Sequence, residues 1–111
     1  MLKLEKQGAV DVMRPVGPLR EQLLDECQVI AERLVEQGWP AIVLDLGQTV
    51  MLNGKSLEWL RELDLQCAEH GGSLSVAGAT DLCAEALRIT GVGVGLQQFR
   101  DVASAVARYA S

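Results

Sequence analysis

The stretch AIVLDL, Ala41 to Leu46, constrains the fold more than any other part of the sequence. Its almost continuous run of apolar, strand-forming residues is typical of a strand at the centre of a sheet, covered on both faces. A long amphipathic helix is predicted before this strand. Pro18 suits its first position, because the N–H that proline lacks would have no partner there, and Gly38 and Pro40 end it.

Shorter periodic patterns predict the remaining elements. Between Lys3 and Val16 apolar residues alternate in places, which indicates two short strands broken near Gly8. Strand, helix and strand in this order form a crossover unit with parallel strands, so we expect an α/β fold. After the central strand we expect a helix over 56–70 and a strand over 73–78, followed by a helix that is capped by Thr80 or Asp81 and closed by Gly91. A weak edge strand through Val92, Val94 and Leu96 is expected next. The last predicted helix covers 100–110, with Val102, Val106 and Tyr109 facing inward.

Size and charge exclude several classes of protein. With 111 residues, 49% of them hydrophobic and 23% charged, we expect one compact domain over 1–111 that folds alone. The longest aliphatic run is too short to cross a bilayer, and the first residues lack the apolar stretch of a secretory signal, so a cytoplasmic protein is predicted. The short aliphatic run also argues against direct insertion into a membrane. The formal charge of -5 argues against nucleic acid as a partner and against anionic lipid headgroups.

The cysteines predict no special chemistry. Cys27, Cys67 and Cys83 are odd in number and widely spaced, which indicates buried thiols rather than a disulfide framework or a paired metal knuckle. Cys67 and His70 lie one helical turn apart, but no second pair of ligands is evident in the sequence. We therefore expect neither a metal nor a cofactor.

The sequence predicts different roles for the two tryptophans. Trp59 lies on the apolar side of the predicted second helix, so packing in the core is the favoured interpretation. Trp39 lies in the turn formed by Gly38 and Pro40, where packing and a role as a partner-binding anchor are about equally consistent with the sequence.

Three local motifs, together with the order of the elements, are similar to those of a known family. They are GPLR at Gly17 to Arg20, IVLDLGQTVMLNGKSL at Ile42 to Leu57, and GGSLSVAGATDLCAEALRITGV at Gly71 to Val92. Over nearly the whole chain, the sequence resembles the STAS domain, the family of bacterial anti-sigma factor antagonists and of a related domain in sulfate transporters. The resemblance implies a mixed, largely parallel sheet of four to five strands packed against about four helices.

The resemblance also implies where the functional surface lies. The family's Asp-Ser-Ser/Thr-Gly-Leu motif, at the start of the second helix, is occupied here by the run from Asn53 to Leu57. Antagonists of this family are switched by phosphorylation of the motif's second Ser/Thr, which here is Lys55, so the usual switch is absent. Asn53 keeps the ability to cap a helix. Ser56 carries a hydroxyl but stands where the family has glycine, so its phosphorylation is a weak hypothesis.

A change of charge accompanies the altered motif. In the family an aspartate follows the glycine and leucine that open the first helix, and Arg20 replaces it here. Together with Lys55, Arg20 shifts the surface from acidic toward basic, which favours an acidic partner. The predicted site is therefore protein-binding, with Asn53 as the cap, Gly54 allowing close approach of a backbone, and Lys55, Ser56 and Arg20 beside them.

The leading hypothesis is a non-enzymatic bacterial regulator that engages an anti-sigma factor, its kinase or another signalling protein and thereby acts on transcription. An alternative is a structural STAS subunit of a stress-sensing scaffold or of a membrane lipid-transport complex. Assembly into a homo-oligomer is left open.

A nucleotide-binding loop is the minor alternative. Gly54, Lys55 and Ser56 follow a strand and precede a helix, as in a phosphate-binding P-loop. The first glycine of that motif would fall on Thr49, and the loop interior over 50–52 is apolar rather than small and flexible. The sequence therefore disfavours nucleotide hydrolysis.

Overall fold

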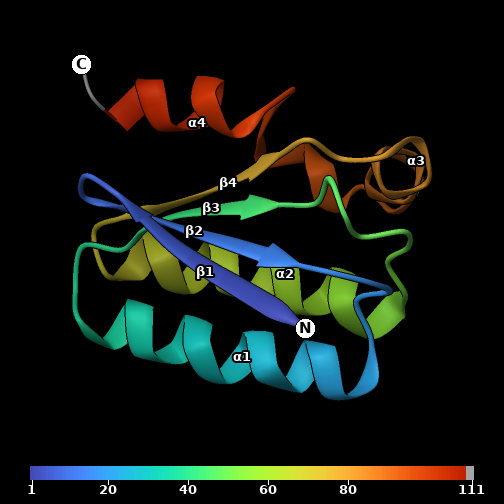
Figure 1. Cartoon of the computed structure of the whole chain (residues 1–111), viewed down its shortest axis with the longest axis horizontal. Coiled ribbons are helices and arrows are strands. Elements are labelled where there is room, and N and C mark those ends of the chain that lie inside the picture. The colour runs from blue at the N-terminus through green and yellow to red at the C-terminus, as the bar shows by residue number, and fades with distance from the viewer. Residues whose placement is uncertain (110–111) are drawn as a thin grey trace.

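The central strand organises a five-stranded sheet in the order β1–β2–β3–β4–β5, seen in the computed structural model of Figure 1, which describes residues 1–109. The strands are β1 (Leu2–Gln7), β2 (Val10–Pro15), β3 (Ala41–Asp45), β4 (Ser73–Ala77) and β5 (Gln97–Phe99). β1 and β2 form an antiparallel hairpin, and β2 to β5 are parallel to one another. The predicted mixed, largely parallel sheet and the break near Gly8 are confirmed.

Helices cover both faces of the sheet. The long helices α1 (Glu21–Glu36) and α2 (Gly54–Glu69) lie below it in Figure 1, and α4 (Val102–Tyr109) lies above it. The shorter α3 (Asp81–Thr90) lies beyond the ends toward which β2 and β3 point. None of the helices described is long and apolar enough to cross a membrane.

β3 is buried from both sides, as its sequence predicts. Ile42 and Leu44 belong to the larger core, which the sheet forms with α1, α2 and α3, whereas Val43 packs in a smaller core beneath α4. All three side chains are fully buried. The predicted inward face of the last helix is confirmed, since its apolar side chains pack on this smaller core.

The first helix begins later than predicted. Pro18 was expected at its first position, but α1 starts at Glu21, after the N-cap Arg20. Leu19 is fully buried, forms a parallel bridge with Leu52, and donates its backbone N–H to the carbonyl of Met51 over 3.2 Å. Because Leu19 is held extended by this pairing, the helix cannot include it.

The predicted edge strand through Val92, Val94 and Leu96 is wrong. Residues Val92–Val94 form a short 3-10 helix, and the edge strand is β5, immediately afterwards. Gly91 closes α3 in a left-handed conformation, φ +75°, and its carbonyl then accepts a hydrogen bond from the N–H of Val94. The alternation of apolar residues with glycine thus reflects tight turns rather than a strand, because glycines lack the side chains that stabilise cross-strand pairing.

The other boundaries agree with the sequence to within two residues. α2 begins at Gly54 rather than Ser56, and α4 at Val102 rather than Arg100. Of the two predicted caps of α3, Thr80 is the one used: its hydroxyl accepts a hydrogen bond from the N–H of Cys83. The predicted last helical residue, Ala110, lies outside the described residues.

The two-sided burial of β3 generates a stability prediction. Leu44→Ala removes a fully buried side chain and leaves a cavity in the larger core, so we expect a loss of about 2–5 kcal/mol in the free energy of unfolding, measured with urea. Ile89→Ala is the control, because Ile89 is 68% exposed on α3 and its replacement should change stability by no more than about 0.5 kcal/mol. Equal losses in the two variants would contradict the assigned core.

Candidate functional site

The start of α2 is fixed by a capping box between Asn53 and Ser56. The side chain of Asn53 accepts a hydrogen bond from the N–H of Ser56 over 2.9 Å. The Ser56 hydroxyl oxygen in turn accepts the N–H of Asn53 over 2.8 Å and donates to the carbonyl of Asn53 over 2.9 Å. Such reciprocal bonds satisfy N–H groups that a helix start otherwise leaves unpaired. The predicted capping role of Asn53 is confirmed.

The capping box separates the motif residues into buried and exposed ones. Ser56 is fully buried, whereas Gly54 and Lys55, the first two residues of the helix, are exposed. Arg20 is exposed at the start of α1. Residues Arg20, Asn53, Gly54, Lys55 and Ser56 are called the α2 corner below.

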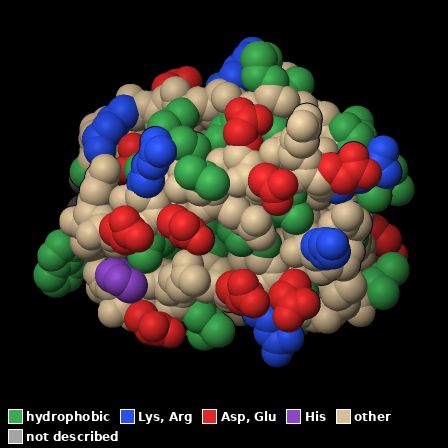
Figure 2. Space-filling model, turned by 90° about the horizontal axis from the view of Figure 1, so that it is seen from below, with side chains coloured by type: hydrophobic (Ala, Val, Ile, Leu, Met, Phe, Trp, Pro, Cys, Tyr) green, Lys and Arg blue, Asp and Glu red, His purple; other side chains and the backbone are tan. Residues whose placement is uncertain are grey.

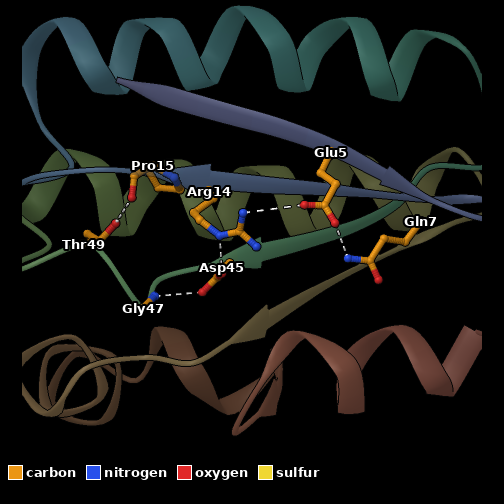
Figure 3. Close-up of polar contacts among 7 residues, drawn as sticks. All are labelled: Glu5, Gln7, Arg14, Pro15, Asp45, Gly47 and Thr49. Carbon is orange, nitrogen blue, oxygen red and sulfur yellow. Dashed lines mark hydrogen bonds and ion pairs between the residues drawn. The ribbon is translucent and has the colours of Figure 1, made fainter.

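Thr49 anchors the loop that leads from β3 to the α2 corner. Its side chain is fully buried, and its hydroxyl donates to the carbonyl of Pro15, at the end of β2, over 3.0 Å (Figure 3). Its own carbonyl accepts hydrogen bonds of 3.3 Å from the hydroxyl of Thr80 and the thiol of Cys83. One residue thus ties the loop to β2 on one side and to the start of α3 on the other.

A second polar contact holds the strand end from which this loop departs. Arg14 of β2 and Asp45 of β3 form an ion pair of 2.7 Å, and Asp45 also accepts the N–H of Gly47 over 2.9 Å (Figure 3). The hydrogen bond to Asp45 raises the pKa of the Arg14 guanidinium above its usual value. Glu5 of β1 adds a weaker contact to Arg14 at 3.7 Å.

Sequence reasoning missed these anchors. The signals were present: Thr49 is a lone hydroxyl residue before the apolar run 50–52, and Arg14 and Asp45 are opposite charges within two apolar strands. Polar residues in such surroundings are usually paired, because burying them unpaired is unfavourable. Their partners, however, lie more than 30 positions away in the chain.

The start of α2 faces the first turns of α1 across a groove. The groove is lined by Glu21, Leu24 and Asp25 of α1 together with Asn53, Gly54 and Lys55 of the α2 corner. Among residues 1–109, Lys55 forms no ion pair with either carboxylate. The side of the protein seen from below in Figure 2 likewise shows acidic side chains scattered among fewer basic ones. The two cations of the corner therefore lie beside acidic groups, and this surface is not uniformly basic.

The hydroxyl of Ser56 is occupied by hydrogen bonds within the capping box. It is buried and holds both the N–H and the carbonyl of Asn53. A phosphate on this oxygen would break these bonds and place a dianion in a buried position, which is costly. Lys55 occupies the exposed position, and it carries no hydroxyl.

The loop before α2 differs from a phosphate-binding loop. Thr49, where that motif has its first glycine, is buried and bonded through its side chain. The carbonyls of Gln48 and Met51 accept hydrogen bonds from Gly17 and Leu19, so this backbone serves the packing of the loop. P-loops instead point successive N–H groups at the phosphates.

Cys67 and His70 do not converge on a site. Cys67 is fully buried and His70 is exposed, with its ring Nδ1 2.9 Å from the carbonyl of Gln66. Within the described part of the chain, no group of three potential ligands could hold a metal ion.

The two tryptophans differ in exposure. Trp59 is 6% exposed and belongs to the larger core, which confirms packing. Trp39 is 82% exposed, with its ring over Gly71, where an added Cβ would come within 3.0 Å of the ring. Its role as a partner-binding anchor stays a prediction.

The capping box predicts that two adjacent residues differ in their effect on stability. Ser56→Ala removes the partner of the partly buried N–H and carbonyl of Asn53, so we expect a loss of about 1–3 kcal/mol in the free energy of unfolding. Lys55→Ala is the matched control: it removes an exposed cation from the first turn of a helix, where cations are unfavourable, and should cost less than about 0.5 kcal/mol. Urea unfolding measures both, and a larger loss for Lys55→Ala would contradict the geometry.

The three cysteines are free and buried, as predicted. Burial raises the pKa of the Cys27 thiol to about 12 and that of Cys67 to about 11, from an ordinary value of 9.0; the carboxylates of Glu26 and Asp64 add to the respective shifts. The unfolded chain therefore loses these protons at a lower pH than the folded protein. The free energy of unfolding should be unaffected by these thiols below pH 9.0 and should fall as pH rises toward about 11 and 12.

Urea unfolding at about pH 8 and about pH 10 measures this loss. The control is the double variant Cys27→Ala/Cys67→Ala, whose stability should fall less between the two pH values because the raised thiol pKa values are gone. An equal fall in the variant and the wild type would show that the thiols do not contribute.

Comparisons with known proteins agree on the fold. No protein-family model matches the sequence, and no similar sequence is found among curated proteins. Among solved structures, the anti-sigma factor antagonist SpoIIAA in its unphosphorylated form has a TM-score of 0.84 at 12% identity, covering 99% of this chain and 96% of SpoIIAA. An anti-sigma factor antagonist from Mycobacterium paratuberculosis has a TM-score of 0.84 at 15% identity, covering 100% of this chain and 94% of that one.

A transporter domain has the same architecture. The STAS domain of a SulP transporter from Vibrio cholerae has a TM-score of 0.78 at 12% identity, covering 96% of this chain and 84% of that domain. These similarities extend from the hairpin at the start of the chain to the last helix. The chain therefore has the STAS-domain fold, the fold of solved anti-sigma factor antagonists.

Proposed function

We propose that this protein is a non-enzymatic regulatory module that binds an anti-sigma factor, its kinase or another signalling protein through the α2 corner. The observation that supports the proposal most directly is the exposure of Lys55 at the second position of α2, in a chain with the fold of anti-sigma factor antagonists. Beneath Lys55, the buried capping box holds the start of the helix in place.

The chemistry of the α2 corner specifies the partner's surface. A helix start favours negative groups, because its N–H groups and its dipole are directed outward there. Lys55 adds a full positive charge, and Arg20 adds another at the neighbouring start of α1. A partner carboxylate is therefore the expected contact of the corner, and basic groups on the partner would pair with Glu21 and Asp25 across the groove.

Binding of this kind would be independent of phosphorylation. Antagonists of the STAS family carry a hydroxyl that can be phosphorylated at the motif's second Ser/Thr. At that position this chain carries Lys55, whose charge is permanent. The neighbouring hydroxyl of Ser56 is buried within the capping box. We infer that the module is constitutively competent to bind, and that its regulation rests on the partner or on its own abundance.

A structural role in a larger assembly is the second candidate. It is favoured by the similarity to the STAS domain of the Vibrio cholerae SulP transporter and to a sulfate transporter family protein from Wolinella succinogenes, in which the fold belongs to a transport protein. In that case this chain would be a stoichiometric subunit of a stress-sensing scaffold or of a membrane lipid-transport complex. The α2 corner would serve as its contact surface in the assembly.

The experiment is affinity capture from lysate of the native host, with the captured proteins quantified and identified by mass spectrometry. The wild type is compared with the double variant Arg20→Glu/Lys55→Glu, which reverses both cations of the corner. Arg61→Glu is the matched control, because Arg61 is exposed on the same helix but lies outside the α2 corner. The specific partner should be depleted at least tenfold with the double variant and retained with the control.

The identity of that partner separates the two candidates. An ATPase-type kinase or an anti-sigma factor supports the regulatory module, and a scaffold or transport complex at fixed stoichiometry supports the structural role. A partner that binds the double variant as well as the wild type would contradict the assignment of the α2 corner. Calorimetric titration with ATP and magnesium should give no binding heat, and heat that is lost in Lys55→Ala would revive the nucleotide-binding alternative.

A further inference from the structure

The outer edge of β1 has no strand partner among residues 1–109. β1 is the first strand in the sheet order, and within residues 1–109 its only strand partner is β2. A groove of about 470 Å³ runs between β1 and α1, lined by Leu2 and Leu4 on the strand and by Val29 and Ile30 on the helix. Leu4 is 49% exposed and Val29 50%, so this edge presents both backbone groups and an apolar surface.

The pairing with β2 determines which backbone groups point outward. Val16 donates its N–H to the carbonyl of Met1 over 2.8 Å, and the amino group of Met1 lies 3.4 Å from the carbonyl of Val16. In an antiparallel ladder such hydrogen-bonded pairs alternate with pairs whose polar groups point away from each other. With the register of β1 on β2, the N–H and C=O groups of Leu2, Leu4 and Lys6 therefore face the free edge.

The charges of β1 then select one register of self-pairing. A two-fold axis through Leu4 places Leu4 opposite Leu4, and Lys3 of each copy directly opposite Glu5 of the other. An axis through Lys3 would place the Lys3 side chains of the two copies opposite each other, and an axis through Glu5 would do the same with the two Glu5 side chains. Like charges in directly opposite positions are unfavourable. Only the axis through Leu4 combines the outward backbone groups with opposite charges.

The side chains on both faces are compatible with this register. Lys3 and Glu5 project on the face that carries the Glu5–Arg14 contact, and Leu2 and Leu4 project toward α1. Lys6 would lie opposite Leu2 of the second copy, and its charge is already paired with Asp11 at 3.6 Å within its own chain. The pairing thus buries no unpaired charge at the edge.

The helices fit this arrangement as well. α1 contacts both β1 and β2, so a continuous sheet with strands about 4.8 Å apart would bring the two copies of α1 to roughly 10 Å, the usual distance between packed helices. The exposed Val29 of each copy would be covered there. Arg33 and Asp25, which both line the groove, carry opposite charges and would face one another between antiparallel copies of α1.

We propose that the protein forms a two-fold symmetric dimer in which the β1 strands of two copies pair antiparallel about Leu4 and join the two sheets into one. The proposal is independent of the function assigned to the α2 corner.

The test exchanges the two charges between copies. Lys3→Glu makes each Lys3–Glu5 contact repulsive between identical chains, and so does Glu5→Lys. In a mixture of the two variants, both contacts become attractive between unlike chains. Sedimentation velocity from micromolar to millimolar concentration should show a dimer for the wild type, monomers for each variant alone at the same concentrations, and restored dimer in the equimolar mixture.

Two further measurements and two further variants complete the experiment. Native mass spectrometry of the mixture should show one copy of each variant in the dimer, and circular dichroism should show that each variant is folded. Leu4→Lys, at a half-exposed position on the axis, should also be monomeric. Lys55→Glu, the same charge change as Lys3→Glu but on the α2 corner, should dimerise like the wild type, which separates this proposal from the proposed function. A wild type that stays monomeric at millimolar concentration, or variants whose mixture does not associate, would overturn it.

Discussion

The exchange of hydrogen bonds between Asn53 and Ser56 is the contact on which the proposed binding surface depends. It uses the hydroxyl of a buried serine and the side chain of the helix cap to complete the first turn of α2. Ser56 is buried in this turn, whereas the residue before it, Lys55, is exposed. The bonds that start the helix therefore also hold the backbone that presents the positive charge of Lys55 to the surface.

Around this contact, the loop from β3 is held by groups that come from distant parts of the chain. Thr49 joins it to β2 and α3, and Leu52 pairs with Leu19 just before α1. This pairing brings the starts of α1 and α2 side by side, so that Arg20, the residue after Leu19, lies near Asn53, the residue after Leu52. α1 in turn borders two surfaces: Asp25 lines both the groove beside Lys55 and the groove beside β1. A regulator that self-associates through β1 would thus carry its binding corners close to the shared helices.

The sequence predicted correctly those features that depend on interactions between neighbouring residues. The apolar run of β3, the break at Gly8 and the caps at Asn53, Thr80 and Gly91 are recognisable because each depends on a few adjacent residues. The start of α1 and the position of β5 were wrong because tertiary contacts outweigh local preference: Leu19 is drawn into a bridge, and the glycines near Val94 form turns. Thr49, Arg14 and Asp45 could be suspected as polar residues within apolar segments, but the residues that they contact are determined by the fold. The acidic groups beside Lys55 likewise depend on how α1 meets α2.

The central claim is that a partner binds at the start of α2, and nuclear magnetic resonance of the isotopically labelled protein in complex with its captured partner tests it most directly. The account predicts that the largest changes in amide chemical shift occur at Gly54, Lys55 and Ser56 and in the first turn of α1, because these groups line the proposed contact. Changes confined to α3 and α4, with the amides at the start of α2 unaffected by saturating partner, would contradict it.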